Sequence, residues 1–194
     1  MTQVAPPTLQ TDRLRLRPLV SGDLDALNAI QSDPVHMRFY PHPFSLDESR
    51  AWIDRVQERY ERDGFGLLAV DDRDSGVFLG NVGPMIQVID GVEEVEIGWS
   101  ITPARARQGI ATEAARACRG WVFEALTVDH FVSLILPANT PSEGVARNLG
   151  MTVWRETMWG SDPTMHFLYR QDRSDVDPPS PGSSVGSSSA GLRG

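Results

Sequence analysis

Apolar residues in the first hundred positions recur with periods that predict a strand, two helices and three further strands. Leucine alternates with arginine over residues 13–18, the two-residue period of a strand with one buried face. Apolar residues then follow helical spacing over residues 24–30. A Ser-x-x-Glu capping box at Ser45 opens a second helix, which ends at Gly64. Three strand-like runs, separated by turn residues, follow over residues 65–70, 77–89 and 92–101.

The pattern changes again in the second half of the chain. Helical spacing predicts a helix over residues 109–126, with an apolar stripe of Ile110, Ala114, Ala117 and Trp121. A strand, a short helix and two more strands are predicted over residues 131–136, 142–149, 151–159 and 164–169. The order β-α-α-β-β-β-α-β-α-β-β predicts one α+β domain, a three-layer α/β arrangement around a mixed sheet.

The last part of the chain has almost nothing to bury. From residue 173 onward the sequence is rich in Ser, Gly and Pro, a composition typical of disorder. We therefore predict a single domain over residues 1–172 and a disordered tail over residues 173–194.

Composition narrows the class of protein without naming a function. The 194 residues, 40% of them apolar, are enough for one sizeable core. No apolar run approaches the roughly 20 residues of a membrane span, and the N-terminus lacks a signal-peptide pattern. We therefore expect a cytoplasmic protein with no membrane partner. The net charge of −8, with arginine as the only basic residue type, disfavours nucleic acid as a ligand.

Residues that bind metals or act as nucleophiles are sparse. A single cysteine, Cys118, forms neither an intramolecular disulfide nor a thiolate metal site by itself, and the four histidines lack ligand spacing. We expect no metal. Cys118 lies beside the apolar stripe of its predicted helix, which favours a small core residue over a nucleophile. The glycine patterns of P-loop and dinucleotide-binding proteins are absent.

The segment WSITPARARQGIATEAA, from Trp99 to Ala115, carries the clearest candidate chemistry. It predicts a strand end, a loop bearing Arg105 and Arg107, and a helix that begins at Gly109. The unpaired N–H groups and partial positive charge of a helix start suit an anion, and the two arginines add cationic donors for a polyphosphate. Taken alone, the segment is equally well explained by two solvated arginines on an ordinary loop.

Four motifs in order resemble one known family. They are TDRLRLRPLVSGDLDAL, FLGNVG, EEVEIGWSITPARARQGIATEA and LPANTPSEGVARNLGM, within a match from about residue 8 to 170. The chain resembles the GNAT superfamily of acetyl-CoA-dependent N-acetyltransferases, in its RimJ/RimL-like branch of ribosomal-protein acetyltransferases. The resemblance implies a mixed, mostly antiparallel sheet flanked by helices, acetyl-CoA as co-substrate, a primary amine as acceptor, and allows a homodimer.

The resemblance also implies which residues hold the cofactor. They lie at the end of one strand, in the loop and helix start that follow, and before the later short helix: Trp99, Ile101, Arg105, Arg107, Gln108, Gly109, Ile110, Ala111, Thr112 and Asn139. The chain departs from the family at two loop positions. Ala106 stands where a Gln or Arg is usual, and Arg107 stands where the first glycine is usual. The family's backbone bulge, which polarises the thioester carbonyl, would fall at Gly98 and Trp99.

Two residues match the family's catalytic positions. Glu96 is the candidate base, and it shares one strand face with Glu94, so the alternative is two glutamates on a solvated face. Ser142 would stabilise the departing thiolate, and its alternative is a plain helix N-cap. Asn139 would bind the pantetheine arm. The tyrosine that many family members use as an acid falls on Ala146.

The acceptor side is less defined in the sequence. Residues 34–43 would line it, and Arg38 is a candidate for binding an acceptor carboxylate, although an ordinary packed loop explains the segment too. The main hypothesis is direct acetyl transfer to a protein N-terminus or a small-molecule amine within a ternary complex. The alternative is an acyl-CoA-binding or sensor module without turnover.

Overall fold

A computed structural model describes residues 6–160 and 163–176 of the chain. In these residues eight strands form one sheet in the order β1-β2-β3-β4-β5-β6-β8-β7. The strands are β1 (Leu9–Gln10), β2 (Leu14–Pro18), β3 (Leu68–Asp72), β4 (Phe78–Ile89), β5 (Val92–Ile101), β6 (His130–Ile135), β7 (Thr152–Trp159) and β8 (Thr164–Asp172). Neighbouring strands are antiparallel except β5 and β6, which are parallel, so the predicted mixed, mostly antiparallel sheet is confirmed.

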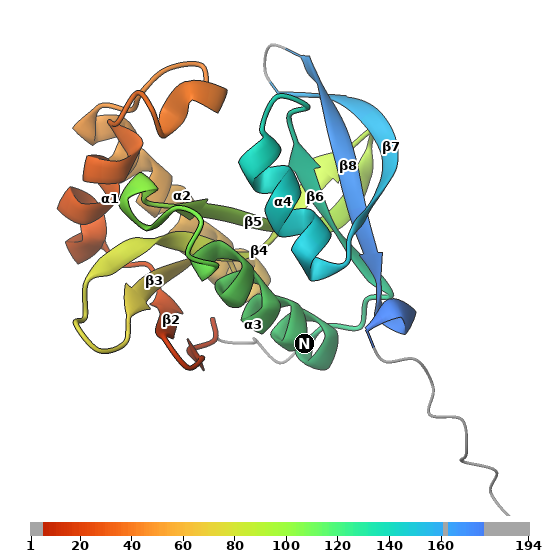
Figure 1. Cartoon of the computed structure of the whole chain (residues 1–194), viewed down its shortest axis with the longest axis horizontal. Helices are drawn as coiled ribbons and strands as arrows, with labels where there is room; N and C mark the ends of the chain where they lie inside the picture. The colour runs from red at the N-terminus through yellow and green to blue at the C-terminus, as the bar shows by residue number, and fades with distance from the viewer. Residues whose placement is uncertain (1–5, 161–162, 177–194) are drawn as a thin grey trace, which may run out of the picture.

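Helices cover both faces of this sheet, which confirms the three-layer α+β architecture. They are α1 (Leu24–Gln31), α2 (Leu46–Asp63), α3 (Ile110–Ala125) and α4 (Thr140–Leu149). Apolar side chains of α3 and α4 pack in one core cluster, and those of α1 and α2 pack in a second. Figure 1 shows β2–β5 with α1–α3 on one side of the molecule and β6–β8 with α4 on the other.

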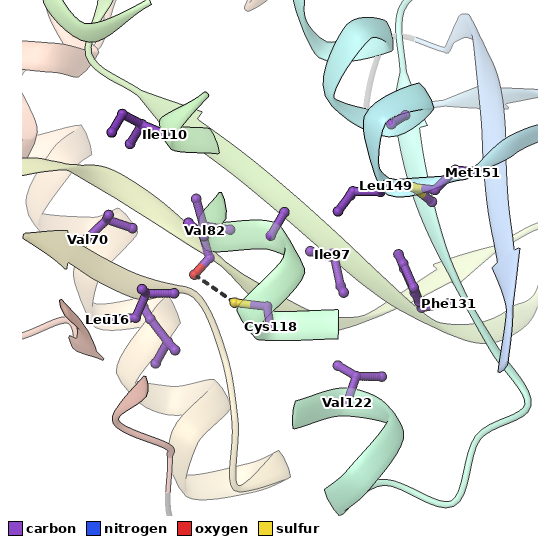
Figure 2. Close-up of a cluster of buried hydrophobic side chains, with 14 of the residues drawn as sticks. Leu16, Val70, Val82, Ile97, Ile110, Cys118, Val122, Phe131, Leu149 and Met151 are labelled. Carbon is purple, nitrogen blue, oxygen red and sulfur yellow. Dashed lines mark hydrogen bonds between the residues drawn. The ribbon is translucent and has the colours of Figure 1, made fainter. Parts of the chain in front are cut away.

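The core explains why α3 lies where it does. The stripe formed by Ile110, Ala114, Cys118 and Val122 is buried against the sheet, and Figure 2 shows it facing side chains of β2–β5. Cys118 is 0% exposed and lies on this stripe, one position away from the predicted one. Its thiol approaches the Val82 carbonyl oxygen at 3.9 Å. The interpretation of Cys118 as a core residue is therefore confirmed.

The sheet opens between its two halves. The β4–β5 ladder is long and continuous, from the pair Gly80 and Ile101 to the pair Ile89 and Val92. By contrast, β5 and β6 share a single bridging pair, Glu96 with Val132. Beyond that pair the two parallel strands diverge, which leaves their facing backbone edges available to a ligand.

Several predicted boundaries were wrong: β1 was not predicted, and β8 runs to Asp172 rather than ending at residue 169. Three further differences have a visible cause. The strand predicted over residues 65–70 begins only at Leu68, because Phe65 and Leu67 are buried without joining the ladder. The helix predicted from residue 142 begins at Thr140, because Asn139 caps it. The domain extends past residue 172, since Arg173 donates hydrogen bonds to carbonyl oxygens at the end of α3 and beyond it. The predicted tail from residue 177 to 194 lies outside the described residues.

Candidate active site

A cavity of about 340 Å³ lies where β5 and β6 diverge. Of the predicted site residues, the structure brings Glu96, Trp99, Asn139 and Ser142 together in its lining. The loop and helix-start residues lie elsewhere, and Gly109 and Thr112 border a second, more open hollow of about 710 Å³ beside β1 and β2. The predicted set is therefore split between the cavity and the start of α3.

Glu96 is the acidic side chain of this cavity. It is only 8% exposed, and the Leu134 N–H of β6 donates to its Oε1 at 3.3 Å. Burial raises the pKa of Glu96, while hydrogen bonds from Gln87 and Leu134 and the nearby charge of Arg59 oppose the shift. A buried carboxylate with a raised pKa in a cavity is suited to accept a proton.

Glu94 lies two residues earlier on the same face of β5 and has a different environment. It is also 8% exposed, and it pairs with His130 Nε2 at 2.9 Å. The solvated-face alternative is therefore wrong for both glutamates. Only Glu96 lines the cavity, so the strand carries one paired carboxylate and one in the cavity.

The divergence of β5 and β6, rather than a bulge, exposes the backbone of β5. The Ser133 hydroxyl donates to the Ile97 carbonyl oxygen at 2.7 Å, so the polar backbone groups of Ile97 face β6. The backbone N–H and C=O groups of successive residues in a strand point to opposite sides, so those of Trp99 point to the same side as those of Ile97. At Trp99, β6 no longer pairs with β5. The β4–β5 ladder runs through Gly98 and Trp99 without a register shift, so the expected bulge was wrong.

The start of α4 forms another wall of the cavity. Asn139 is the N-cap, and its side-chain oxygen accepts a hydrogen bond from the Ser142 backbone N–H at 3.2 Å. Ser142 is thus the third helical residue, and its predicted alternative role as the N-cap was wrong. Ser142 lines the cavity, and the side-chain NH₂ group of Asn139 remains a donor for a ligand.

The start of α3 offers donors for an anion. Gly109 is the N-cap in a left-handed conformation, with φ of 77°, and no side chain caps the first turn. The N–H groups of Ile110, Ala111 and Thr112 therefore carry the partial positive charge of the helix without a side-chain partner.

The two loop arginines have different environments. Arg105 forms an ion pair with Asp72 of β3 and approaches the Gln108 side chain, so its guanidinium already has partners. Arg107 is exposed and has a φ of 60°, at a position where the family usually has glycine. Of the two, Arg107 is the cation with more freedom to contact a phosphate.

These features fit coenzyme A, which has a pyrophosphate, a narrow pantetheine arm and a terminal sulfur. The uncapped turn of α3 suits the pyrophosphate. The open edge of β5 and the amide of Asn139 can bind the amide-rich arm. Ser142 lines the cavity, and its hydroxyl can donate to the terminal sulfur.

The loop between α1 and α2 contributes only part of what the sequence suggested. Phe39 and Tyr40 line the cavity. His36 instead hydrogen-bonds the Ser100 hydroxyl at 2.8 Å, and burial lowers its pKa. Arg38 is exposed, lies over the Phe39 ring at 4.4 Å and donates to the Val35 carbonyl, so the structure does not place it in the cavity lining. His42 lies near Glu48, outside the cavity.

Sequence reasoning missed several cavity residues that come from distant elements. Trp52 lies on α2, Met85 and Gln87 on β4, Trp159 on β7 and His166 on β8. These residues belong to no recognisable motif. The hydrophobic period of each strand or helix could only have indicated which of its residues face the interior. Tertiary packing alone brings them around Glu96.

The described residues also limit other functions. In the ranges 6–160 and 163–176, no three His, Cys, Asp or Glu side chains gather as a metal site. Within the same ranges, no helix combines the length and hydropathy that a bilayer crossing requires.

The fold and the cleft define a protein suited to a phosphate-bearing acyl carrier, and comparisons with known proteins identify its family. Residues 13–152 match the family described as the acetyltransferase (GNAT) domain. The uncharacterized protein YkkB of Bacillus subtilis strain 168 is 33% identical over 144 residues, covering 74% of this chain and 84% of YkkB. The chain therefore belongs to the GNAT acetyltransferase family.

Solved structures agree with this assignment. An acetyltransferase of Agrobacterium tumefaciens has a TM-score of 0.75 and 30% sequence identity, covering 87% of this chain and 96% of that one. The RimL ribosomal-protein α-N-acetyltransferase, solved in complex with coenzyme A, has a TM-score of 0.69 and 16% identity, covering 86% of this chain and 98% of that one. At that identity the likeness to RimL shows the fold alone.

Proposed function

We propose that this protein transfers the acetyl group of acetyl-CoA to a primary amine by direct transfer within a ternary complex. One observation carries the proposal: the buried side chain of Glu96 lines a cavity that Ser142 also lines, beside the open edge of β5. Acetyl-CoA supplies the acetyl group as an activated thioester.

Each residue then has a separate task. Glu96 takes the proton that the acceptor ammonium must lose before its nitrogen can attack, directly or through a water molecule. The Trp99 N–H donates to the carbonyl oxygen as negative charge develops there. As the N–C bond forms and the C–S bond breaks, the electron pair leaves on sulfur, where the Ser142 hydroxyl stabilises it. The nitrogen loses its second proton, which the thiolate takes up to give the CoA thiol. Asn139 holds the pantetheine arm through its amide.

Direct transfer is supported by the state of the cysteine. Cys118 is 0% exposed, and burial raises the pKa of its thiol to about 12. It therefore stays protonated and away from the cavity at neutral pH, so a covalent acyl-enzyme through this thiol is disfavoured.

A thiol-release assay tests the proposal. Acetyl-CoA is combined with primary amines and with peptides that have a free N-terminus, and CoA release is measured with and without each acceptor. Acceptor-dependent release that is lost in Glu96→Gln, with acetyl-CoA binding retained, supports the enzyme. Tight acetyl-CoA binding without acceptor-dependent release from any candidate supports the alternative, an acyl-CoA-binding module.

A further inference from the structure

Four aromatic side chains line the acceptor side of the cavity, together with apolar side chains and the polar side chains of Asn81, Gln87 and Ser100. Phe39 and Tyr40 come from the α1–α2 loop, Trp52 from α2, and Trp159 from β7, with Met85 and Leu134 beside them. The residues nearer Asn139 and Ser142 belong to the side that fits the acyl carrier. An acceptor that reaches Glu96 must therefore lie among rings.

The cavity contains few charges. Among the described residues that line it, Glu96 is the only carboxylate, no arginine is present, and His166 is the one other titratable side chain besides Tyr40. His166 Nδ1 donates to the Thr164 carbonyl at 2.8 Å. A single carboxylate is complementary to a single ammonium group.

Cations near the cavity are not positioned in its lining. Arg38 is occupied by the Phe39 ring and the Val35 carbonyl. Arg59 of α2 is close enough for its charge to act on Glu96, yet it does not line the cavity. A carboxylate next to the reacting amine would thus approach Glu96 without a lining cation to balance it.

Tyr40 is a partly exposed residue of the cavity lining. It leaves 40% of its surface exposed, yet burial of its hydroxyl raises its pKa, and the charge of Glu96 adds to the shift. Tyr40 therefore contributes an aromatic side chain to the lining and is still accessible to an incoming ligand.

We propose that the acceptor is a primary amine carried on an aromatic group, with no carboxylate beside the amine. This inference rests on the proposed function and names its substrate class. The ring packs against the aromatic wall, and the ammonium group reaches Glu96. An amino acid adds an unbalanced carboxylate, and a polyamine adds ammonium groups for which the cavity has no second carboxylate. A protein N-terminus adds backbone amides, which the rings cannot pair, and the polar side chains of Gln87, Ser100 and Ser133 already have partners.

Matched acceptors test the inference with the wild-type protein. We expect kcat/KM for 2-phenylethylamine to exceed that for propylamine, L-phenylalanine, spermidine and an alanine-starting hexapeptide by about tenfold or more, because apolar contact and an unpaired buried charge each discriminate on that scale. Equal or higher kcat/KM for L-phenylalanine, spermidine or the peptide overturns the inference while leaving the proposed acetyl transfer intact. If kcat/KM for propylamine equals that for 2-phenylethylamine, the ring has no role in recognition and the inference is overturned.

A pair of variants tests whether the aromatic wall is responsible. Tyr40→Ala is expected to lower kcat/KM for 2-phenylethylamine about fivefold and to change that for propylamine less than about twofold, on the scale of one lost ring contact. Tyr40→Phe keeps the ring and is expected to keep the preference. An equal loss for both amines in Tyr40→Ala contradicts the assignment of the ring.

A binding measurement separates this inference from the proposed function. Titration of 2-phenylethylamine and L-phenylalanine into protein saturated with CoA requires no turnover. Tighter binding of 2-phenylethylamine supports the proposed acceptor class. It does so even if no acceptor causes CoA release, a result that would overturn the proposed acetyl transfer. Tighter binding of L-phenylalanine overturns the inference whatever the activity.

Discussion

The region that fits coenzyme A and the acceptor side of the cavity are built from different groups. The first is made largely of backbone: the open edge of β5 at Trp99 and the start of α4 capped by Asn139, both at the cavity, and the uncapped first turn of α3, which lies outside its lining. The acceptor side is made of large side chains from the α1–α2 loop, α2, β4, β7 and β8. Glu96 lies between the two sides.

This difference teaches how each side is specified. A backbone site depends on where strands and helices begin and end, and a short motif can encode that. An aromatic cavity depends on which distant side chains meet, and each of them can change separately. The cofactor side is therefore expected to tolerate side-chain substitution better than the acceptor side, except where a side chain does chemistry.

The largest expected effect comes from the residue between the two sides. Glu96→Gln should lower kcat about 10²- to 10⁴-fold, the range for a positioned general base, with little change in acetyl-CoA affinity. In the wild type, acidification should abolish activity as Glu96 becomes protonated. This loss should occur at a higher pH than the ordinary pKa of a glutamate would give, because burial raises the pKa of Glu96. A pH–rate profile and an acetyl-CoA titration measure both effects.

Glu94→Gln is the matched control, since Glu94 is equally buried on the same face but pairs with His130. It should keep a kcat near that of the wild type, with its fold checked by thermal melting. If the two variants lose activity equally, or if Glu96→Gln keeps the wild-type pH profile, Glu96 is not the base.

The next largest effects are expected at the start of α4, where Ser142 is assigned to catalysis and Asn139 to helix capping and cofactor binding. Ser142→Ala should lower kcat about tenfold, the scale of one lost hydrogen bond to a developing charge, and leave the melting temperature unchanged. Asn139→Ala should cost about 1 kcal/mol of stability through the lost N-cap, and should also raise KM for acetyl-CoA. A Ser142→Ala protein with unchanged kcat would remove the hydroxyl from the mechanism.

A smaller effect concerns the phosphate end. Arg107→Gly should raise the Kd for CoA about threefold, as expected for one exposed ion pair, without changing the Kd for pantetheine, which lacks the pyrophosphate. Its free energy of unfolding should stay within about 1 kcal/mol, because relief of the left-handed conformation offsets the larger entropy of unfolded glycine.

Arg105→Gln provides the comparison for Arg107. Arg105 is already paired with Asp72, so its loss should act mainly on stability and change the CoA affinity less. The opposite order of the two CoA affinities, measured by calorimetry, would assign the phosphate contact to Arg105.

The smallest effect is on stability. The pKa of Glu96 is raised in the folded state, so the folded protein binds more protons than the unfolded chain, and wild-type stability falls as pH rises from the unfolded pKa through the folded one. Glu96→Gln removes this dependence. Its melting temperature should exceed that of the wild type near pH 7, and the difference should close towards pH 4. A gap that widens on acidification would contradict the raised pKa.

Sequence patterns predicted the strand and helix order well because period and turn residues are local signals. The capping box at Ser45 and the helix start at Gly109 lie where the sequence placed them. One error arose from a tertiary contact and another from a local one. Arg173 extends the domain by donating to carbonyl oxygens near the end of α3, whereas Asn139, three residues before Ser142, takes the capping role that was the alternative considered for Ser142.

The site shows the same division. The resemblance predicted that Glu96, Trp99, Asn139 and Ser142 act together, and the structure brings them into one cavity. It also predicted a bulge that is absent, because the open edge of β5 results from the divergence of β6. That divergence is a property of two strands far apart in the chain, and no single segment contains it.

By itself, the sequence determined the family fold, the helix start that suits a phosphate and the strand that carries Glu96, since these follow from short-range periodicity and backbone conformation. Only the tertiary structure decided that Glu96 is buried in a cavity while Glu94 is paired, that Arg105 is already partnered, and that rings from several distant elements surround the acceptor site. The physical reason is that burial and pairing depend on which residues are neighbours in space, and these neighbours cannot be read from the order of residues along the chain.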